Sequence, residues 1–168
     1  FDYLCSELGV DTVCICGTAQ TDDSSNNKVL HMWNAVKLKD KWYMANATWD
    51  DWDEAETMGD AFTYLNITDK MLSIDHTTDK TYADITETAY EEMDSYINNF
   101  VPKCTATEYC FFLREGATLT SPDDVDALAA GMVRSSEKGR NSVIAYVDTD
   151  EYTADEMGKA LFEGNQPD

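Results

Sequence analysis

Hydrophobic and polar residues are arranged along the chain in patterns that predict a mixed fold of strands and helices. An almost unbroken apolar run predicts a buried strand over residues 10–17. Two more strands are predicted over residues 29–38 and 41–48, and the polar pair Lys39-Asp40 between them predicts a hairpin. Before the first strand, apolar residues spaced i, i+3, i+4 and i+7 predict a helix that ends at Gly9.

The middle of the chain is polar and acidic. Residues 18–28 and the carboxylate-rich residues 49–60 are predicted to be loops. Residues 68–71 have the pattern of a capped helical turn, and residues 82–100 predict an acidic amphipathic helix that ends before Pro102.

After Pro102 the pattern changes, and strands and helices are predicted to alternate. The predicted elements are a strand over residues 109–114, a helix over 121–135 capped by Ser121, a strand over 142–148 and a helix over 153–163. This βαβα order is typical of a small α/β module. We therefore predict two domains, over residues 1–101 and 102–168.

Composition limits the possible partners. A chain of 168 residues of which 43% are hydrophobic can form a folded core, so disorder is not expected. Its formal charge of −21 repels phosphates and anionic lipids, so no nucleic-acid partner is expected. No apolar stretch reaches the roughly 18 residues that indicate a membrane span, so no membrane insertion is expected.

The cysteines and acidic residues do not predict a metal site or a cofactor. The five cysteines lack the spacing of a disulfide framework or a zinc site, and most are expected to be small core residues. A bridge between Cys104 and Cys110 stays open. The acidic residues after Trp49 lack the pattern of a calcium-binding EF-hand.

The predicted hairpin brings together side chains that suit nucleophilic catalysis. With a loop centred on Lys39-Asp40, paired residues have numbers that sum to 79. His31 then lies opposite Thr48, and Asn46 lies diagonally beside His31 on the same face. An imidazole held by a side-chain acceptor can take a proton from a thiol, and Asn is the orienting member of some Cys-His-Asn sites. The alternative is a hydrogen-bonded structural histidine beside a tryptophan-rich core.

Two segments of this hairpin resemble the transglutaminase-like superfamily, whose bacterial members are papain-like cysteine enzymes. His31-Met32-Trp33-Asn34 resembles the H-A-W-N strand that opens with the catalytic His of the family. Residues 42–51 resemble its W-Y-x-x-D-x-T-W-D-D strand, but Asn46 stands where the family has Asp. The resemblance covers residues 1–80. It implies an α+β fold with a papain-like core and an antiparallel sheet.

The resemblance also implies a function. It implies a cysteine hydrolase, a peptidase that acts on peptide or protein amide bonds, with His31 and Asn46 as catalytic residues. The substrate pocket would include the tryptophans of this region, Trp33, Trp42 and Trp49. The nucleophilic Cys of the family lies at the N-terminus of the preceding helix, so it is expected about seven residues before Phe1. An extracellular or cell-envelope location is expected from the family.

Two other functions stay open. Asn46 in place of Asp removes a charge that would stabilise an imidazolium, which raises the possibility of a non-catalytic binding module. An amide cross-linking acyltransferase is the other, because it would form the same acyl-enzyme. His76, further along, is expected to be a structural residue or to lie at the rim of the site.

Overall fold

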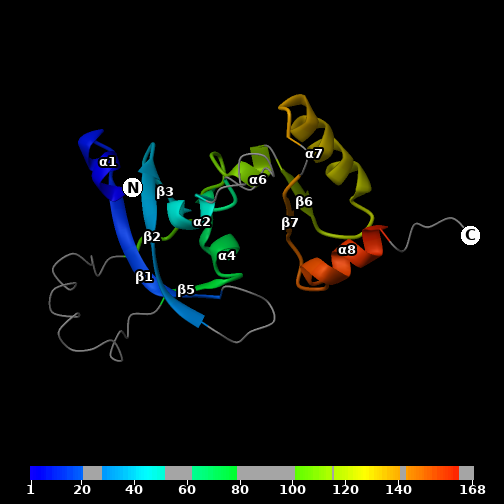
Figure 1. Ribbon diagram of the computed structural model, residues 1–168, viewed down its shortest axis with the longest axis horizontal. Coiled ribbons are helices and arrows are strands. Elements are labelled where there is room, and N and C mark those ends of the chain that lie inside the picture. The colour runs from blue at the N-terminus through cyan, green and yellow to red at the C-terminus, as the bar shows by residue number, and fades with distance from the viewer. Residues whose placement is uncertain (21–27, 52–61, 79–100, 115, 141–142, 163–168) are drawn as a thin grey trace, which may run out of the picture. The chain divides into compact units, whose positions relative to one another are not determined.

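The computed structural model describes residues 1–20, 28–51, 62–78, 101–114, 116–140 and 143–162. The chain forms two compact units, one of residues 1–49 and 64–110 and the other of residues 50–63 and 111–168. The fold is α+β, with a five-stranded antiparallel sheet and several short helices (Figure 1).

The sheet belongs to the first unit. The strands of the sheet and the short helices of the same unit, in the described part of the chain, are α1 (Asp2–Glu7), β1 (Thr12–Gln20), β2 (Lys28–Leu38), β3 (Lys41–Ala45), α2 (Ala47–Asp50), β4 (Leu65–Ile67), α4 (Asp69–Leu72) and β5 (His76–Thr78). The strands follow the order β4-β3-β2-β1-β5, and every neighbouring pair is antiparallel. β1 therefore lies between the hairpin and β5.

Helix α1 ends as predicted. Gly9 adopts a left-handed conformation with φ 70°, which suits a residue without a Cβ atom. Gly9 N donates to Ser6 O over 3.0 Å, and Val10 N donates to Cys5 O over 2.9 Å. These two bonds satisfy carbonyl groups that a helix end leaves without partners, as in a Schellman motif.

The β2–β3 hairpin has the predicted register. The ladder runs from Leu38↔Lys41 to Asn34↔Ala45, so paired numbers sum to 79. Lys39 and Asp40 have φ of 49° and 66°, the conformation of a type I′ turn, whose twist matches that of the flanking strands.

Strands β3 and β1 end at other residues than predicted. β3 ends at Ala45 and not at residue 48, because the chain turns at Asn46 into α2. Thr48 is therefore helical, and the expected pairing of His31 with Thr48 does not form. β1 continues three residues past Gly17, through part of the predicted loop, and Ala19 on this extension is fully buried.

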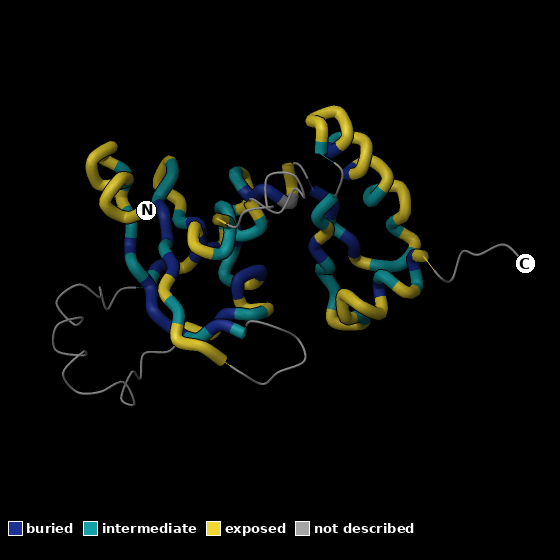
Figure 2. The backbone as a smooth tube through the Cα atoms, viewed as in Figure 1, coloured by how far each residue is buried: buried dark blue, intermediate teal, exposed yellow. Residues whose placement is uncertain are grey.

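Buried residues occur along the strands of the sheet (Figure 2), and they belong to both of its faces. One face carries a hydrophobic cluster of Val36, Tyr43 and Ala45, with Tyr109 packed against it. Alternation along the strands places Trp33 and its neighbours on the opposite face, where Trp33 is 1% exposed. This second face also carries His31.

Helix α4 begins as predicted. Thr68 is its N-cap, and the Thr68 side chain accepts a hydrogen bond from Met71 N over 3.2 Å. Asp69 in the same turn accepts from Cys104 N over 2.9 Å, which ties this turn to a segment 35 residues away.

The second unit has the predicted βαβα order, with different boundaries. Its elements are α6 (Phe111–Arg114), β6 (Ala117–Leu119), α7 (Val125–Glu137), β7 (Ala145–Val147) and α8 (Ala154–Phe162). β6 and β7 pair in parallel, as a βαβ unit requires.

The prediction of a strand over residues 109–114 is wrong. Phe111 begins a helical turn that buries its ring beside Phe62, with a centroid distance of 5.8 Å. Aromatic residues favour strands where neighbouring side chains pack on them in a sheet. Here β6, and not residues 109–114, is the strand that pairs with β7.

The start of α7 differs from the prediction as well. The helix begins at Val125, with Asp124 instead of Ser121 as its N-cap. The Asp124 carboxylate accepts hydrogen bonds from Thr120 N and Ser121 N over 2.7 and 3.0 Å, which closes a turn ahead of the helix.

The predicted helix over residues 82–100 and most of the two predicted loops lie outside the described residues. Among the residues that are described, none of the helices is long and apolar enough to cross a membrane.

Candidate functional site

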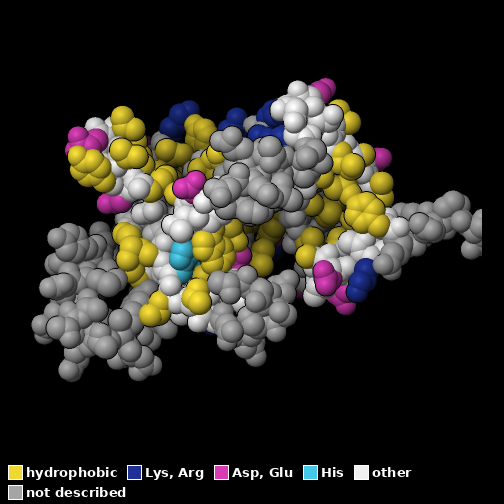
Figure 3. Space-filling model, in the orientation of Figure 1, with side chains coloured by type: hydrophobic (Ala, Val, Ile, Leu, Met, Phe, Trp, Pro, Cys, Tyr) yellow, Lys and Arg dark blue, Asp and Glu magenta, His cyan; other side chains and the backbone are white. Residues whose placement is uncertain are grey.

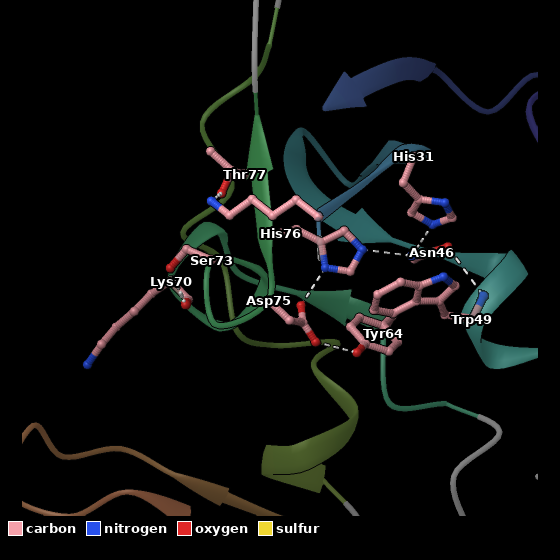
Figure 4. Close-up of polar contacts among 10 residues, drawn as sticks. His31, Asn46, Trp49, Tyr64, Lys70, Ser73, Asp75, His76 and Thr77 are labelled. Atoms are coloured by element: carbon pink, nitrogen blue, oxygen red, sulfur yellow. Dashed lines mark hydrogen bonds and ion pairs between the residues drawn. The ribbon is translucent and has the colours of Figure 1, made fainter. Parts of the chain in front are cut away.

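The site is centred on Asn46, which contacts both histidines of the chain (Figure 4). Asn46 Nδ2 lies 2.8 Å from His31 Nε2 and 2.9 Å from His76 Nε2. The predicted neighbourhood of His31 and Asn46 on one face of the hairpin is confirmed. Asn46 is 1% exposed and His76 is 4% exposed, whereas His31 is half-buried.

Asn46 is held in place because it also caps helix α2. Its side-chain oxygen accepts a hydrogen bond from Trp49 N over 3.3 Å, the bond that an N-cap residue makes to the third residue of a helix. The oxygen therefore points to α2 and the amide NH₂ points to the two rings. The reverse orientation would place NH₂ against the N–H of Trp49, two donors facing each other.

This orientation differs from the expectation that an acceptor on Asn46 would hold His31. The amide NH₂ group carries two hydrogens and donates one to each Nε2 atom. An Nε2 atom that accepts a hydrogen bond carries no proton, so the neutral His31 ring carries its proton on Nδ1.

His76, which the sequence predicted to be a structural residue or to lie at the rim, is a member of the site. Its Nδ1 atom forms a hydrogen bond with Asp75, and the other oxygen of Asp75 accepts from the Tyr64 hydroxyl over 2.5 Å. Figure 4 shows the resulting chain of contacts from Tyr64 through Asp75, His76 and Asn46 to His31.

Two small residues on β1 allow this arrangement. The ladders place Gly17 opposite His31 on one side of β1 and Ala19 opposite His76 on the other. Strands two apart in a sheet are separated by roughly 10 Å. The rings of His31 and His76 nevertheless lie 5.6 Å apart, because they lean over β1 from both sides.

Gly17 is essential to this crossing. A Cβ atom at Gly17 would lie 2.4 Å from the Trp33 ring and 2.2 Å from the backbone oxygen of Thr77. A glycine inside a strand often marks such a close approach, and this was the available signal that side chains gather over β1.

Aromatic rings wall the site. The ring of Trp49 lies 5.1 Å from that of His31 and 4.6 Å from that of His76, and Trp33 lies 6.3 and 5.1 Å from the same two rings. The buried Nε1 atom of Trp33 has no hydrogen-bond partner within the described part of the chain. Figure 3 shows one histidine at the surface between hydrophobic side chains.

Trp42 lies apart from these rings along the hairpin. It pairs with Lys37, six residues along β2 from His31, which corresponds to about 20 Å of strand. The structure thus brings two of the three predicted pocket tryptophans, Trp33 and Trp49, to His31.

Burial biases the charge state of His31. Desolvation is the largest cause and lowers the pKa of His31, the hydrogen bond with Asn46 opposes it, and the smaller effects of His76 and Asp75 lower and raise it, respectively. His31 is therefore biased toward its neutral form, which is the form that can accept the Asn46 hydrogen bond.

Cys14, Cys16, Cys104 and Cys110 do not supply a nucleophile to this site. Cys14 and Cys16 alternate with the residues of β1 that face His31, so they lie on the other face of the sheet. Burial raises the pKa of Cys14, and it raises the pKa of Cys104 to about 12. Cys104 and Cys110 are both buried thiols and form no disulfide bond.

No group of three or more potential metal ligands occurs among the residues that the structure describes. In comparisons with known proteins, the chain matches no protein-family model and no curated protein sequence.

Proposed function

We propose that the chain is the base-bearing part of a transglutaminase-like cysteine hydrolase with a papain-like core, which acts on peptide or protein amide bonds. The observation that carries the proposal is the 2.8 Å contact between His31 Nε2 and Asn46 Nδ2. It joins the two residues that the sequence motifs assign to the catalytic site, and it directs the other ring nitrogen of His31 away from Asn46.

The proposed reaction uses an upstream thiol and His31. The thiol transfers its proton to His31, and the thiolate attacks the amide carbonyl carbon to form a carbon–sulfur bond. His31 then gives the proton to the amine nitrogen as the carbon–nitrogen bond breaks. A water molecule, deprotonated by His31, hydrolyses the thioester and restores the thiol.

The amide of Asn46 has to invert for His31 to act as a base through Nδ1. In the present orientation Nδ1 carries the proton, so it has no lone pair for the proton of a thiol. Inversion forfeits the bond from Trp49 N to the Asn46 oxygen and leaves that N–H facing the NH₂ group, at a cost of roughly 1–3 kcal/mol. A cost of this size makes the inverted orientation a minor population of the free chain.

The remaining parts of the proposal follow from the resemblance. The nucleophile is a Cys about seven residues before Phe1, at the start of the helix to which α1 belongs, where a helix N-terminus lowers a thiol pKa. Trp33 and Trp49 line the acyl pocket. The protein is extracellular or associated with the cell envelope.

Thiol labelling of the protein that extends before Phe1 tests this proposal. Near neutral pH, we expect iodoacetamide to modify one upstream Cys faster than Cys104 and Cys110, which are buried. His31→Ala should slow this modification at least about tenfold, because the thiolate loses its partner. Lys39→Ala, an exposed change at the hairpin turn, is the matched control and should leave the rate unchanged.

Two outcomes would overturn the proposal. One is Ser, Ala or Gly at the upstream position. The other is an upstream thiol that iodoacetamide modifies as fast in His31→Ala as in the unchanged protein. Mass spectrometry of the labelled peptides identifies which cysteine reacts.

A non-catalytic binding module is the second candidate, and one observation favours it. Asn46 presents two donors to the rings, which suits neutral imidazoles and not the imidazolium that stabilises a thiolate. This candidate predicts binding of a peptide without its cleavage. A labelled peptide that stays intact after long incubation with the full-length protein, while still bound, would favour it.

A further inference from the structure

Both amide hydrogens of Asn46 and one lone pair of its side-chain oxygen are engaged in hydrogen bonds. The oxygen accepts from Trp49 N at 3.3 Å, and the two amide hydrogens go to Nε2 of His31 and Nε2 of His76. Because Asn46 is 1% exposed, water does not readily replace any of these partners. The states of the two rings are therefore linked through one amide.

We propose that His76 is a positioning residue: held by Asp75, it fixes the orientation of the Asn46 amide and thereby places the proton of neutral His31 on Nδ1. The inference deepens the proposed function, because a His31 ring with its proton on Nδ1 cannot take the proton of the thiol through that atom. This catalytic consequence rests on the proposed function. The proton placement itself is a property of this chain and can be measured without catalysis.

Asp75 sets the tautomer of His76. The carboxylate accepts a hydrogen bond, so Nδ1 of His76 carries a proton and Nε2 of the neutral ring is an acceptor. The Tyr64 hydroxyl donates to the second oxygen of Asp75 and keeps the carboxylate in place. An acceptor at Nε2 of His76 then requires that Asn46 turns its NH₂ group toward the rings.

Among the described residues, charged and titratable groups near His76 and Thr77 come from β2 and from the segment ahead of β4. They are His31 on β2, Tyr64 ahead of β4, and Lys28 at the start of β2, whose Nζ lies 3.5 Å from the Thr77 hydroxyl. A second proton on His76 would convert Nε2 into a donor and break the contact with the Asn46 NH₂ group. Inversion of the amide would then present its oxygen to both rings and move the His31 proton to Nε2.

Imidazole nitrogen NMR of the isotopically labelled chain tests the inference directly. Long-range proton–nitrogen correlations distinguish an Nδ1–H from an Nε2–H ring, and the chain has only two histidines to assign. Near neutral pH we expect His31 as the Nδ1–H tautomer. In His76→Phe, which offers Asn46 no acceptor, the ratio of Nδ1–H to Nε2–H at His31 should fall about threefold or more.

Conservative and indirect variants separate positioning from simple packing. His76→Gln provides a side-chain oxygen that can accept the Asn46 hydrogen, so it should retain the tautomer ratio of the unchanged chain. Asp75→Ala frees His76 to take the Nε2–H form and should shift His31 as His76→Phe does. Because the Asp75 side chain is 26% exposed, this variant remains useful where His76→Phe does not fold.

The outcomes are decisive in both directions. A His31 ring that is Nε2–H in the unchanged chain, or a ratio that Asp75→Ala leaves unaltered in a folded protein, would overturn the inference. The two experiments can also disagree. If thiol labelling fails but the expected tautomer shifts are observed, the proposed hydrolase function is removed and the positioning role of His76 stays in place.

Discussion

At the scale of single residues, Asn46 decides what His31 can do. Its oxygen caps α2 and its NH₂ group faces the rings, so the residue serves the fold and the site at once. Asp at this position, which the sequence motif has, would keep an oxygen for the cap and present the second oxygen to the rings. Asn in place of Asp therefore presents hydrogen-bond donors to the rings instead of an acceptor, while it preserves the cap.

Asn46→Asp should raise the pKa of His31. A carboxylate in hydrogen-bond contact favours the charged ring, whereas burial in the unchanged chain lowers the pKa of His31. Titration of the His31 ring protons by NMR measures the shift, which we expect to be about one unit or more. Asn34→Asp, the same change on the other face of β2, is the control and should have a smaller effect. An unchanged or lower pKa of His31 in Asn46→Asp would contradict the contact between residue 46 and the His31 ring.

The lowered pKa of His31 also makes the free energy of unfolding depend on pH. The ring binds a proton more readily in the unfolded chain, with a pKa of about 6.5, than in the folded one. The contribution of His31 to the free energy of unfolding is thus complete above about pH 6.5 and is lost as the pH falls toward the folded pKa. In Asn46→Asp this dependence should weaken or reverse.

At the scale of elements, the site depends on how closely β2 and β5 approach over β1. Gly17 has the contacts of a residue that tolerates no side chain, because Trp33 and the backbone of Thr77 occupy the space of a Cβ atom. Thr77 adjoins His76, so a shift of β5 moves a ring of the site.

Gly17→Ala should destabilise the fold and disturb the site. A methyl group would be 2.2 Å from the oxygen of Thr77, and relief requires a backbone shift, so we expect a loss of about 1–3 kcal/mol in the free energy of unfolding. Denaturant unfolding measures the loss, and NMR of His76 reports the shift of β5. Gly158→Ala in α8, where a Cβ atom meets no atom within 4 Å, is the matched control and should be neutral or stabilising. Equal stabilities of the two variants would disprove the close packing over β1.

At the scale of the whole molecule, charge is the dominant feature. The formal charge of −21 means that carboxylates repel one another in the compact state. Lysines of the hairpin offset part of this repulsion. Lys37 Nζ lies 3.5 Å from Asp11 Oδ2, and Lys41 forms an ion pair with Glu108. The hydrogen bond from Lys41 lowers the pKa of Glu108 to about 2. Exposed pairs of this kind contribute little to stability.

Added salt should therefore stabilise the protein. Raising NaCl from about 0.01 M to about 0.15 M shortens the screening length from about 30 Å to about 8 Å, which weakens the net repulsion more than it weakens the ion pairs of the hairpin lysines. We expect the free energy of unfolding to rise by on the order of 1 kcal/mol. Urea denaturation at the two concentrations measures it, with KCl as a control that should act alike. A decrease would show that the ion pairs outweigh the repulsion.

The sequence by itself determined the features that depend on neighbours along the chain. The hairpin register, the end of α1 at Gly9, the cap at Thr68 and the βαβα order all follow from patterns within a few residues. The contact between His31 and Asn46 belongs with these, because a tight turn between paired strands fixes which residues share a face.

Only the tertiary structure decided that His76 belongs to the site and that Asn46 faces both rings with its NH₂ group. Asn46 and His76 are 30 residues apart, and they meet because β1 separates β2 from β5 and carries Gly17 and Ala19 at the crossing. Periodicity specifies the face of a strand but not which strand lies beside it. The order of the strands, and with it the partner of Asn46, depends on packing across the whole sheet.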